Sequence, residues 1–225
     1  MNRKVGEVGM KKEPFFSVIV PEHNSEEFMD KGLDSIRSQT FQDYQLIIVC
    51  DKCTDHTAVR ACNWLRPGTR DRLITTEAGR CAAARNAGLD AAEGKWILFM
   101  DDDDYWMDEK AFELIEHEIR SYGGKLDILA FGFYWKEIGY RMNSEARLYT
   151  AVWNKAWKKE FIDRIGARFP DWAHSDDEGF SRITHKKASI RFFEAYLYYY
   201  NFMREGSLTW QIENRLIDGT IPPEE

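Results

Sequence analysis

Short apolar runs alternate with amphipathic segments over the first hundred residues, and this alternation restricts the fold more than any other feature of the sequence. The runs are only a few residues long, rich in β-branched side chains, and lie at Phe15–Val20, Tyr44–Cys50 and Lys95–Met100, with a weaker one at Leu73–Thr75. Continuous apolar runs of this length are typical of strands buried on both faces. Strands that alternate with helices predict an α/β fold with a mostly parallel central sheet flanked by helices.

Helix signals occupy the intervals between these runs. Ser25 is expected to cap a helix that carries Phe28, Leu33 and Ile36 on one face. Thr54 or Asp55 is expected to cap the next helix, and an alanine-rich helix is expected to follow Gly79 and end at Gly94. In such sheets ligands collect at the carboxyl ends of the strands.

The pattern changes from Leu126 onward. Strands are expected at 126–135 and 190–200, separated by a Trp- and Lys-rich stretch and a helix through Phe180. The expected organisation is a flexible N-terminal tail, a nucleotide-binding α/β half, a smaller C-terminal acceptor-side half of the same domain and a C-terminal tail, at 1–14, 15–125, 126–210 and 211–225.

Composition limits the partners of the chain. With 31 Lys and Arg against 38 Asp and Glu, the net charge of −7 disfavours binding to nucleic acid through phosphate neutralisation. The four cysteines are irregularly spaced, which favours reduced thiols in a cytoplasmic protein over a zinc site. No apolar run reaches the 18 or so residues of a membrane span. A soluble protein is predicted, and peripheral membrane contact and a homodimer both remain open.

Four consecutive aspartates, Asp101–Asp104, follow directly after the strand that ends at Met100. A run of charges is usually a solvated loop, but this one is predicted to emerge at the ligand-binding edge of the sheet. Closely packed carboxylates need a cation or a proton, and oxygen ligands suit Mg²⁺ or Mn²⁺. Metal binding is therefore favoured over an acidic loop.

Other polar residues at the strand ends have two interpretations each. Asp51 could accept hydrogen bonds from a base or ribose, or cap a helix, although Asp55 suits a cap better. Asn24 could be a turn residue or a ligand contact. Arg85, followed by Asn86, could form a surface salt bridge or bind a diphosphate.

Two segments in the second half carry further candidates. The segment His174–Glu178 contains carboxylates that could favour a helix N-terminus or deprotonate an acceptor hydroxyl. Trp153, Lys155 and Trp157 alternate as one face of a strand does, and the ordinary expectation is packing tryptophans with an exposed lysine.

In order along the chain, several of these segments resemble motifs of the family 2 inverting glycosyltransferases with the GT-A fold, which build bacterial surface polysaccharides. The resemblance spans roughly Phe15 to Thr209 and rests on Pro21-Glu-His-Asn24, Cys50-Asp-Lys-Cys-Thr-Asp55, Gly79 to Gly88 with Ala84-Arg85-Asn86, Met100 to Asp104 followed by Trp106, Trp153-Asn-Lys155, Lys159-Glu-Phe161, Gly166 to Pro170, Asp176-Asp177 and Arg204-Glu-Gly-Ser207. The chain departs from the family pattern on the donor side, at His23, Lys52 and Cys53.

The resemblance implies a metal-dependent enzyme that moves a sugar, with inversion, from a nucleoside-diphosphate sugar to a hydroxyl of a saccharide or lipid-linked saccharide. It implies that Mn²⁺ or Mg²⁺ is bound by Asp103 and Asp101, with Asp104 orienting the site. Nucleotide-sugar contacts are implied for Pro21, Asn24, Asp51, Arg85, Asp101, Asp102 and Lys155. The general base is implied at Asp177, because Phe180 stands three residues beyond it as an apolar residue usually does, whereas counting from Arg168-Phe169-Pro170 points to Asp176.

Two alternative functions would use the same kind of sheet. A sugar-1-phosphate nucleotidyltransferase would need a glycine-rich, basic loop after the first strand, and the chain has the acidic stretch Pro21–Glu27 there. A binding module without catalysis would fit the departures on the donor side, but the intact aspartate run argues against it.

Overall fold

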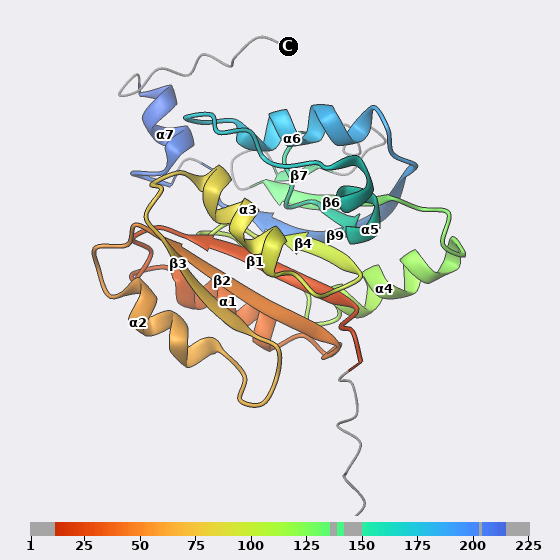
Figure 1. The fold of residues 1–225 in the computed structure, drawn as a ribbon, viewed down its shortest axis with the longest axis horizontal. Helices are drawn as coiled ribbons and strands as arrows, with labels where there is room; N and C mark the ends of the chain where they lie inside the picture. Colours follow the sequence, from red (N-terminus) through yellow and green to blue (C-terminus); the bar gives the residue numbers. More distant parts are fainter. Residues whose placement is uncertain (1–11, 136–138, 142–149, 203, 215–225) are drawn as a thin grey trace, which may run out of the picture.

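The computed structural model describes residues 12–135, 139–141, 150–202 and 204–214. Its strands form one sheet in the order β3-β2-β1-β4-β8-β6-β9-β5, and β7 pairs with β6 outside this path. The strands are β1 (Phe16–Glu22), β2 (Tyr44–Asp51), β3 (Arg72–Thr76), β4 (Trp96–Phe99), β5 (Tyr105–Trp106), β6 (Ile128–Trp135), β7 (Gly139–Arg141), β8 (Lys155–Lys158) and β9 (Ile190–Tyr200). Figure 1 shows this sheet between two layers of helices.

The first four strands form the parallel half of the sheet, as predicted. β1 pairs in parallel with β2 on one side and β4 on the other, and β2 pairs in parallel with β3. β1 continues through Pro21 to Glu22, two residues beyond the apolar run at Phe15–Val20. The pairing of β1 with β4 ends at Ile19, so Pro21 has a partner strand on one side only and its missing N–H breaks no ladder.

The second half of the sheet is mixed. β8 lies between β4 and β6 and is antiparallel to both, and β9 runs parallel to β6. β5, which follows the aspartate run, pairs antiparallel with the end of β9. The two halves of the sequence therefore share one continuous sheet, and residues from both reach the same edge.

Helices cover both faces of the sheet, with two separate apolar layers beneath them. The α-helices are α1 (Met29–Arg37), α2 (Thr57–Ala61), α3 (Cys81–Ala91), α4 (Ala111–Ser121), α5 (Lys159–Ile165), α6 (Asp176–His185) and α7 (Leu208–Glu213). α1 and α4 pack on one face with the side chains of Val18 and Val20. α3, α5 and α6 pack on the other face with Ile19 and Phe99. Figure 1 shows α3 and α6 as neighbours above the same end of the sheet.

Three local expectations were wrong or incomplete. Ser25 does not cap α1, which begins at Met29, because its hydroxyl bonds the Glu22 carboxylate instead. α4 was not predicted, although Phe112, Ile115 and Ile119 are spaced as one buried helix face. Lys155 is fully buried rather than exposed, because β8 is an interior strand covered on both sides.

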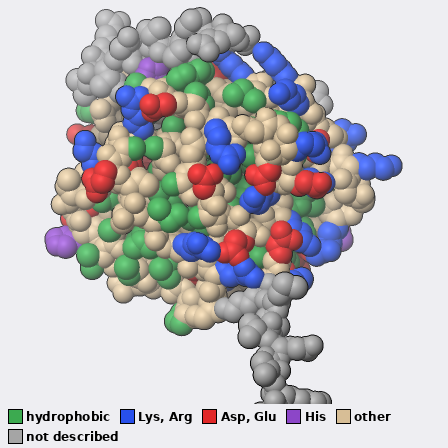
Figure 2. All heavy atoms as spheres, viewed as in Figure 1, with side chains coloured by type: hydrophobic (Ala, Val, Ile, Leu, Met, Phe, Trp, Pro, Cys, Tyr) green, Lys and Arg blue, Asp and Glu red, His purple; other side chains and the backbone are tan. Residues whose placement is uncertain are grey.

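The surface carries charges of both signs. On the face shown in Figure 2, Lys and Arg side chains are interspersed with Asp and Glu and form no broad field of one sign. Within the described parts of the chain, no helix is long and apolar enough to cross a membrane.

Candidate active site

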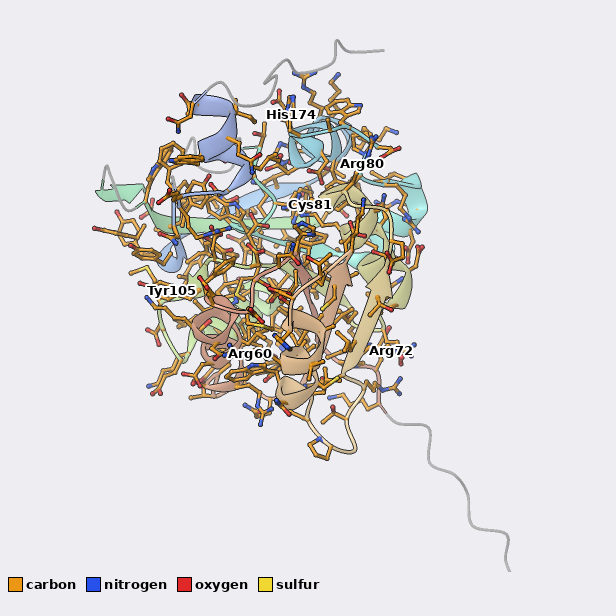
Figure 3. All side chains as sticks on the ribbon, turned by 90° about the vertical axis from the view of Figure 1, so that its left-hand side faces the viewer. Arg60, Arg72, Arg80, Cys81, Tyr105 and His174 are labelled. Atoms are coloured by element: carbon orange, nitrogen blue, oxygen red, sulfur yellow. The ribbon has the colours of Figure 1, made fainter. Side chains whose placement is uncertain are left out.

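The candidate site lies where strands from the parallel half end. β1, β2 and β4 end near Glu22, Asp51 and Met100, and the parallel register places these ends at one edge of the sheet. Figure 3 shows the beginning of α3, at Arg80 and Cys81, below His174, which precedes α6. The edge therefore gathers residues of both halves of the chain.

Asp51 organises the loop that leads into α3. Its Oδ1 accepts a hydrogen bond from Thr76 Oγ1 at 2.6 Å, and its Oδ2 accepts one from the Arg80 N–H at 2.6 Å. Although burial acts in the opposite direction, the hydrogen bonds from Thr76 and from the backbone N–H groups of 78–80 lower the pKa of Asp51. The carboxylate is thus ionised and fixed beside the first turn of α3.

His23 and Asn24 connect the loop after β1 to the loop after β2. His23 Nδ1 lies 2.7 Å from the Asp51 carbonyl oxygen, and Asn24 Oδ1 accepts from the Thr54 N–H at 2.8 Å. Asn24 has a left-handed backbone with φ of 49°, a conformation that asparagine tolerates better than most residues. Pro21 is buried inside β1, and its fixed backbone angle restricts the end of the strand from which this loop starts.

The four aspartates have different partners. Asp101 Oδ1 accepts from Arg85 at 2.6 Å, and Asp103 Oδ2 accepts from Arg204 Nε at 2.6 Å. Asp104 is buried and accepts from the Tyr198 hydroxyl at 2.7 Å and the Asn201 N–H at 2.8 Å. A side chain with this many fixed partners suits an orienting role.

The remaining carboxylates of this edge are held together under electrostatic repulsion. Burial is the largest cause that raises the pKa of Asp102 to about 8. The negative charge of Asp103 adds to the shift, and Arg204 opposes it. Burial and the charge of Asp102 raise the pKa of Glu22 well above its usual range. Among the described residues, Glu22 Oε1 is a buried oxygen without a hydrogen-bond partner.

The side chains of Glu22 and the aspartate run form a set of ligands that suits a hard divalent cation. All of its ligand atoms are carboxylate oxygens, which Mg²⁺ and Mn²⁺ prefer, and a cation would relieve the repulsion that raises the pKa of Asp102. In the described parts of the chain, no three His, Cys, Asp or Glu side chains are already arranged to hold a metal.

Arg85 links the aspartate run to the segment of the predicted base. Its guanidinium donates to Asp101 and, at 2.8 Å, to Asp176 Oδ2, and the side chains of Arg85 and Asp176 are each only 6% exposed. The sequence left open whether Arg85 forms a surface salt bridge or contacts a diphosphate. The structure places it in a buried bridge between two carboxylates that are 75 residues apart in the sequence (176 − 101).

Asp177, the next residue on α6, is partly exposed, and its Oδ1 accepts from the Glu178 N–H at 2.9 Å. Desolvation raises the pKa of Asp177 to about 6, although Arg85 acts in the opposite direction. A carboxylate with this pKa is ionised at neutral pH and is more basic than an ordinary aspartate.

Lys155 lies beneath this segment. Its Nζ donates to the Ala151 carbonyl and to Asn154 Oδ1, both at 2.7 Å. Burial lowers the pKa of Lys155 to about 7, and Asp177 opposes the shift. The amine is thus a buried group that interacts with Asp177, rather than a surface group.

The structure brings most of the predicted residues to one edge, but sequence reasoning missed several of their partners. Tyr198 and Thr76 gave no signal beyond their place in a strand, and Glu22 was noted only as part of an acidic loop. Arg204 was noted in the Arg-x-Gly-Ser pattern, without its ion pair to Asp103.

A mostly parallel sheet with carboxylates at its strand ends, and an aspartate pair on a nearby helix, is the arrangement that the sequence motifs predicted. The sequence profile of glycosyl transferase family 2 matches residues 17–193. The chain belongs to this family, as the sequence motifs indicated.

A curated relative supports this assignment. The chain is 27% identical over 212 residues to an uncharacterized glycosyltransferase, EpsJ, of Bacillus subtilis (strain 168). The match covers 83% of this chain and 61% of the relative. The chain therefore spans less than two thirds of the length of that relative.

Solved structures confirm the predicted GT-A fold. S. aureus TarS 1-349 in complex with UDP-GlcNAc superposes with a TM-score of 0.74 at 24% identity, over 87% of this chain and 60% of TarS. The mannosyltransferase PcManGT from Pyrobaculum calidifontis, in complex with GDP-Man and Mn²⁺, superposes with a TM-score of 0.69 at 19% identity, over 94% of this chain and 67% of that one.

Proposed function

We propose that the chain transfers a sugar from a nucleoside-diphosphate sugar to a hydroxyl of a saccharide or lipid-linked saccharide, with inversion at the anomeric carbon. The main support for this proposal is the buried Arg85 bridge, because its two ion pairs connect the aspartate run of the donor side to the aspartate pair on α6. Such an arrangement holds a donor-binding group and a candidate base in a fixed relation.

The proposed donor side lies in residues 15–125, with contacts from Pro21, Asn24 and Asp51 at the nucleoside. Mg²⁺ or Mn²⁺ would be held by Asp103 and Asp101, with Asp102 nearby, and would offset the charge of the leaving diphosphate. The complexes of TarS with UDP-GlcNAc and of PcManGT with GDP-Man and Mn²⁺ support this choice of donor and metal.

The proposed acceptor side lies in residues 126–210, with Asp177 as general base. Asp176 is the alternative, but its carboxylate is already paired with Arg85, whereas Asp177 has an elevated pKa and a partly exposed side chain. Asp177 would take the proton of the acceptor hydroxyl as that oxygen attacks the anomeric carbon from the face opposite the leaving group. Lys155 would support Asp177 electrostatically from below.

A cytoplasmic location is proposed because all four cysteines are free thiols, which suits a reducing compartment. Peripheral contact with a membrane would bring the enzyme to a lipid-linked acceptor, and a homodimer would be compatible with the fold.

The test is a panel of nucleotide sugars, each with and without Mn²⁺, read by thermal shift and by release of nucleoside diphosphate. A native-state ligand raises the unfolding temperature, so the donor should stabilise the chain, and more so with Mn²⁺. Release of nucleoside diphosphate would exclude a binding module, whereas formation of nucleoside triphosphate and sugar-1-phosphate from the nucleotide sugar on addition of pyrophosphate would indicate a nucleotidyltransferase. No stabilisation and no release with any sugar would refute the proposal.

A further inference from the structure

Asn86 makes two hydrogen bonds to the backbone of one residue that is far away in the sequence. Its Nδ2 donates to the Phe169 carbonyl at 2.9 Å, and its Oδ1 accepts from the Phe169 N–H at 2.9 Å. Both ends of the carboxamide are used, and only an amide side chain offers a donor and an acceptor in this arrangement. Phe169 is therefore fixed to α3 in position and in orientation.

Phe169 in turn contacts α6 directly. Its ring stacks on the ring of Phe180 with centroids 4.2 Å apart and planes 6° from parallel. Phe99 of the sheet closes the cluster, edge-on to Phe169 at 5.3 Å and to Phe180 at 6.3 Å. Phe180 lies three residues after Asp177 on the same helix, so the two side chains share a face. The position of Phe169 consequently sets the position of the helix turn that carries Asp177.

α3 is also tied to the donor side. Its first turn follows the Arg80 N–H that donates to Asp51, and Arg85 donates to Asp101 of the aspartate run. One helix thus contacts the proposed nucleoside loop, the aspartate run and, through Asn86, the segment that precedes the base.

We propose that Asn86 is a positioning residue that sets the distance between the donor site and Asp177, acting through Phe169 and Phe180. This inference rests on the proposed function, with Asp177 as its base. Displacement of a reacting group by about 1 Å can cost about 10²-fold in rate. Both of these side-chain hydrogen bonds of Asn86 go to Phe169, and neither goes to the nucleoside loop. Substitution of Asn86 should therefore leave donor binding intact.

The test uses substitutions of graded severity at Asn86. Asn86→Asp keeps the size but replaces the donor to the Phe169 carbonyl by an oxygen, and Asn86→Gln offers both groups displaced by one methylene. We expect the kcat for release of nucleoside diphosphate to fall about 10- to 100-fold in Asn86→Asp and less in Asn86→Gln. The Kd for the nucleotide sugar that the panel identifies as donor should stay within about twofold of the parental value.

Asp90→Asn is the matched control. Asp90 lies one turn further along α3 and accepts from Arg168, the neighbour of Phe169, at 3.0 Å, but this pair is exposed. An exposed pair contributes little, so we expect its kcat to stay within about twofold of the parent. If Asn86 had only a structural role, its substitution would lower the unfolding temperature, but the kcat measured well below that temperature would stay at the parental value.

The outcomes separate the two proposals. If Asn86→Asp retains the parental kcat while Asp177→Asn loses turnover, the positioning role is wrong and the proposed function stands. Loss of donor affinity in both Asn86→Asp and Asn86→Gln would also overturn it, because Asn86 would then act on the donor site. If the parent releases no nucleoside diphosphate from any donor, the proposed function fails and this inference fails with it.

Discussion

The pH dependence of turnover should report the ionisation of Asp177. Desolvation raises the pKa of this carboxyl to about 6, and a general base works only when it is deprotonated. With a pKa of about 6, about 90% of the base is ionised at pH 7 and about 10% at pH 5, so the rate should fall about tenfold between these values. The sign is fixed, since a raised pKa moves the loss of activity to higher pH than an ordinary aspartate would.

The assay is release of nucleoside diphosphate at saturating donor and Mn²⁺ between pH 4.5 and 8, which are about the limits set by this titration. Asp177→Asn should lower the rate about 10²- to 10⁴-fold, retain donor binding and lose the acid limb. A limb that persists in Asp177→Asn, or one centred near the ordinary aspartate pKa of about 4 in the parent, would refute the assignment.

Asp176→Asn is the comparison for that experiment. Asp176 forms a buried ion pair with Arg85, and removal of one partner from such a pair typically costs about 3 kcal/mol or more. We therefore expect Asp176→Asn to lower the free energy of unfolding more, and Asp177→Asn to lower turnover more. The reverse ranking in turnover would move the role of base to Asp176.

Three further predictions concern the donor side and the core. Asp103→Asn should abolish the Mn²⁺-dependent rise in unfolding temperature on donor binding while the circular dichroism spectrum stays unchanged; an undiminished Mn²⁺ effect would contradict the metal assignment. Asp51→Ala should weaken nucleoside diphosphate binding and speed amide hydrogen exchange at 78–80, because the carboxylate accepts from this loop; parental affinity would show that the nucleoside lies elsewhere. Gly88→Ala should cost about 1–3 kcal/mol in chemical denaturation, because a Cβ there would lie 2.4 Å from Ile19 Cγ2; unchanged stability would mean that α3 shifts freely on the sheet.

The parallel half of the fold was predictable because its signal is local. The runs before Pro21, Asp51 and Asp101 are continuous and apolar, as strands buried on both faces must be. The strand at 190–200 was also predicted with its observed bounds. The order of strands in the second half was not predictable, because the antiparallel insertion of β8 between β4 and β6 depends on pairing between distant segments.

The same distinction applies to the candidate site. The aspartate run and the pair Asp176 and Asp177 are candidates that residue type and place in the sequence already indicate. The partners of Arg85 were not, because Asp176 lies 91 residues from it and no spacing rule relates them. The burial of Lys155 was missed for the same reason, since it follows from the interior position of β8 and not from the alternation of its own neighbours.

Charge balance at the sheet edge gives further support to the proposed metal dependence. Arg85 is already shared between two carboxylates, and Arg204 is paired with Asp103 and lies 4.0 Å from Asp102. A nucleoside diphosphate would bring additional negative charge to an edge where burial, and repulsion by Asp103, already raise the pKa of Asp102 to about 8. Because both arginines are engaged, a diphosphate that paired with either of them would displace it from its carboxylate. A divalent cation held by Asp103 and Asp101 would offset the negative charge of the diphosphate, and the Arg85 bridge, and with it the position of α6, would stay intact.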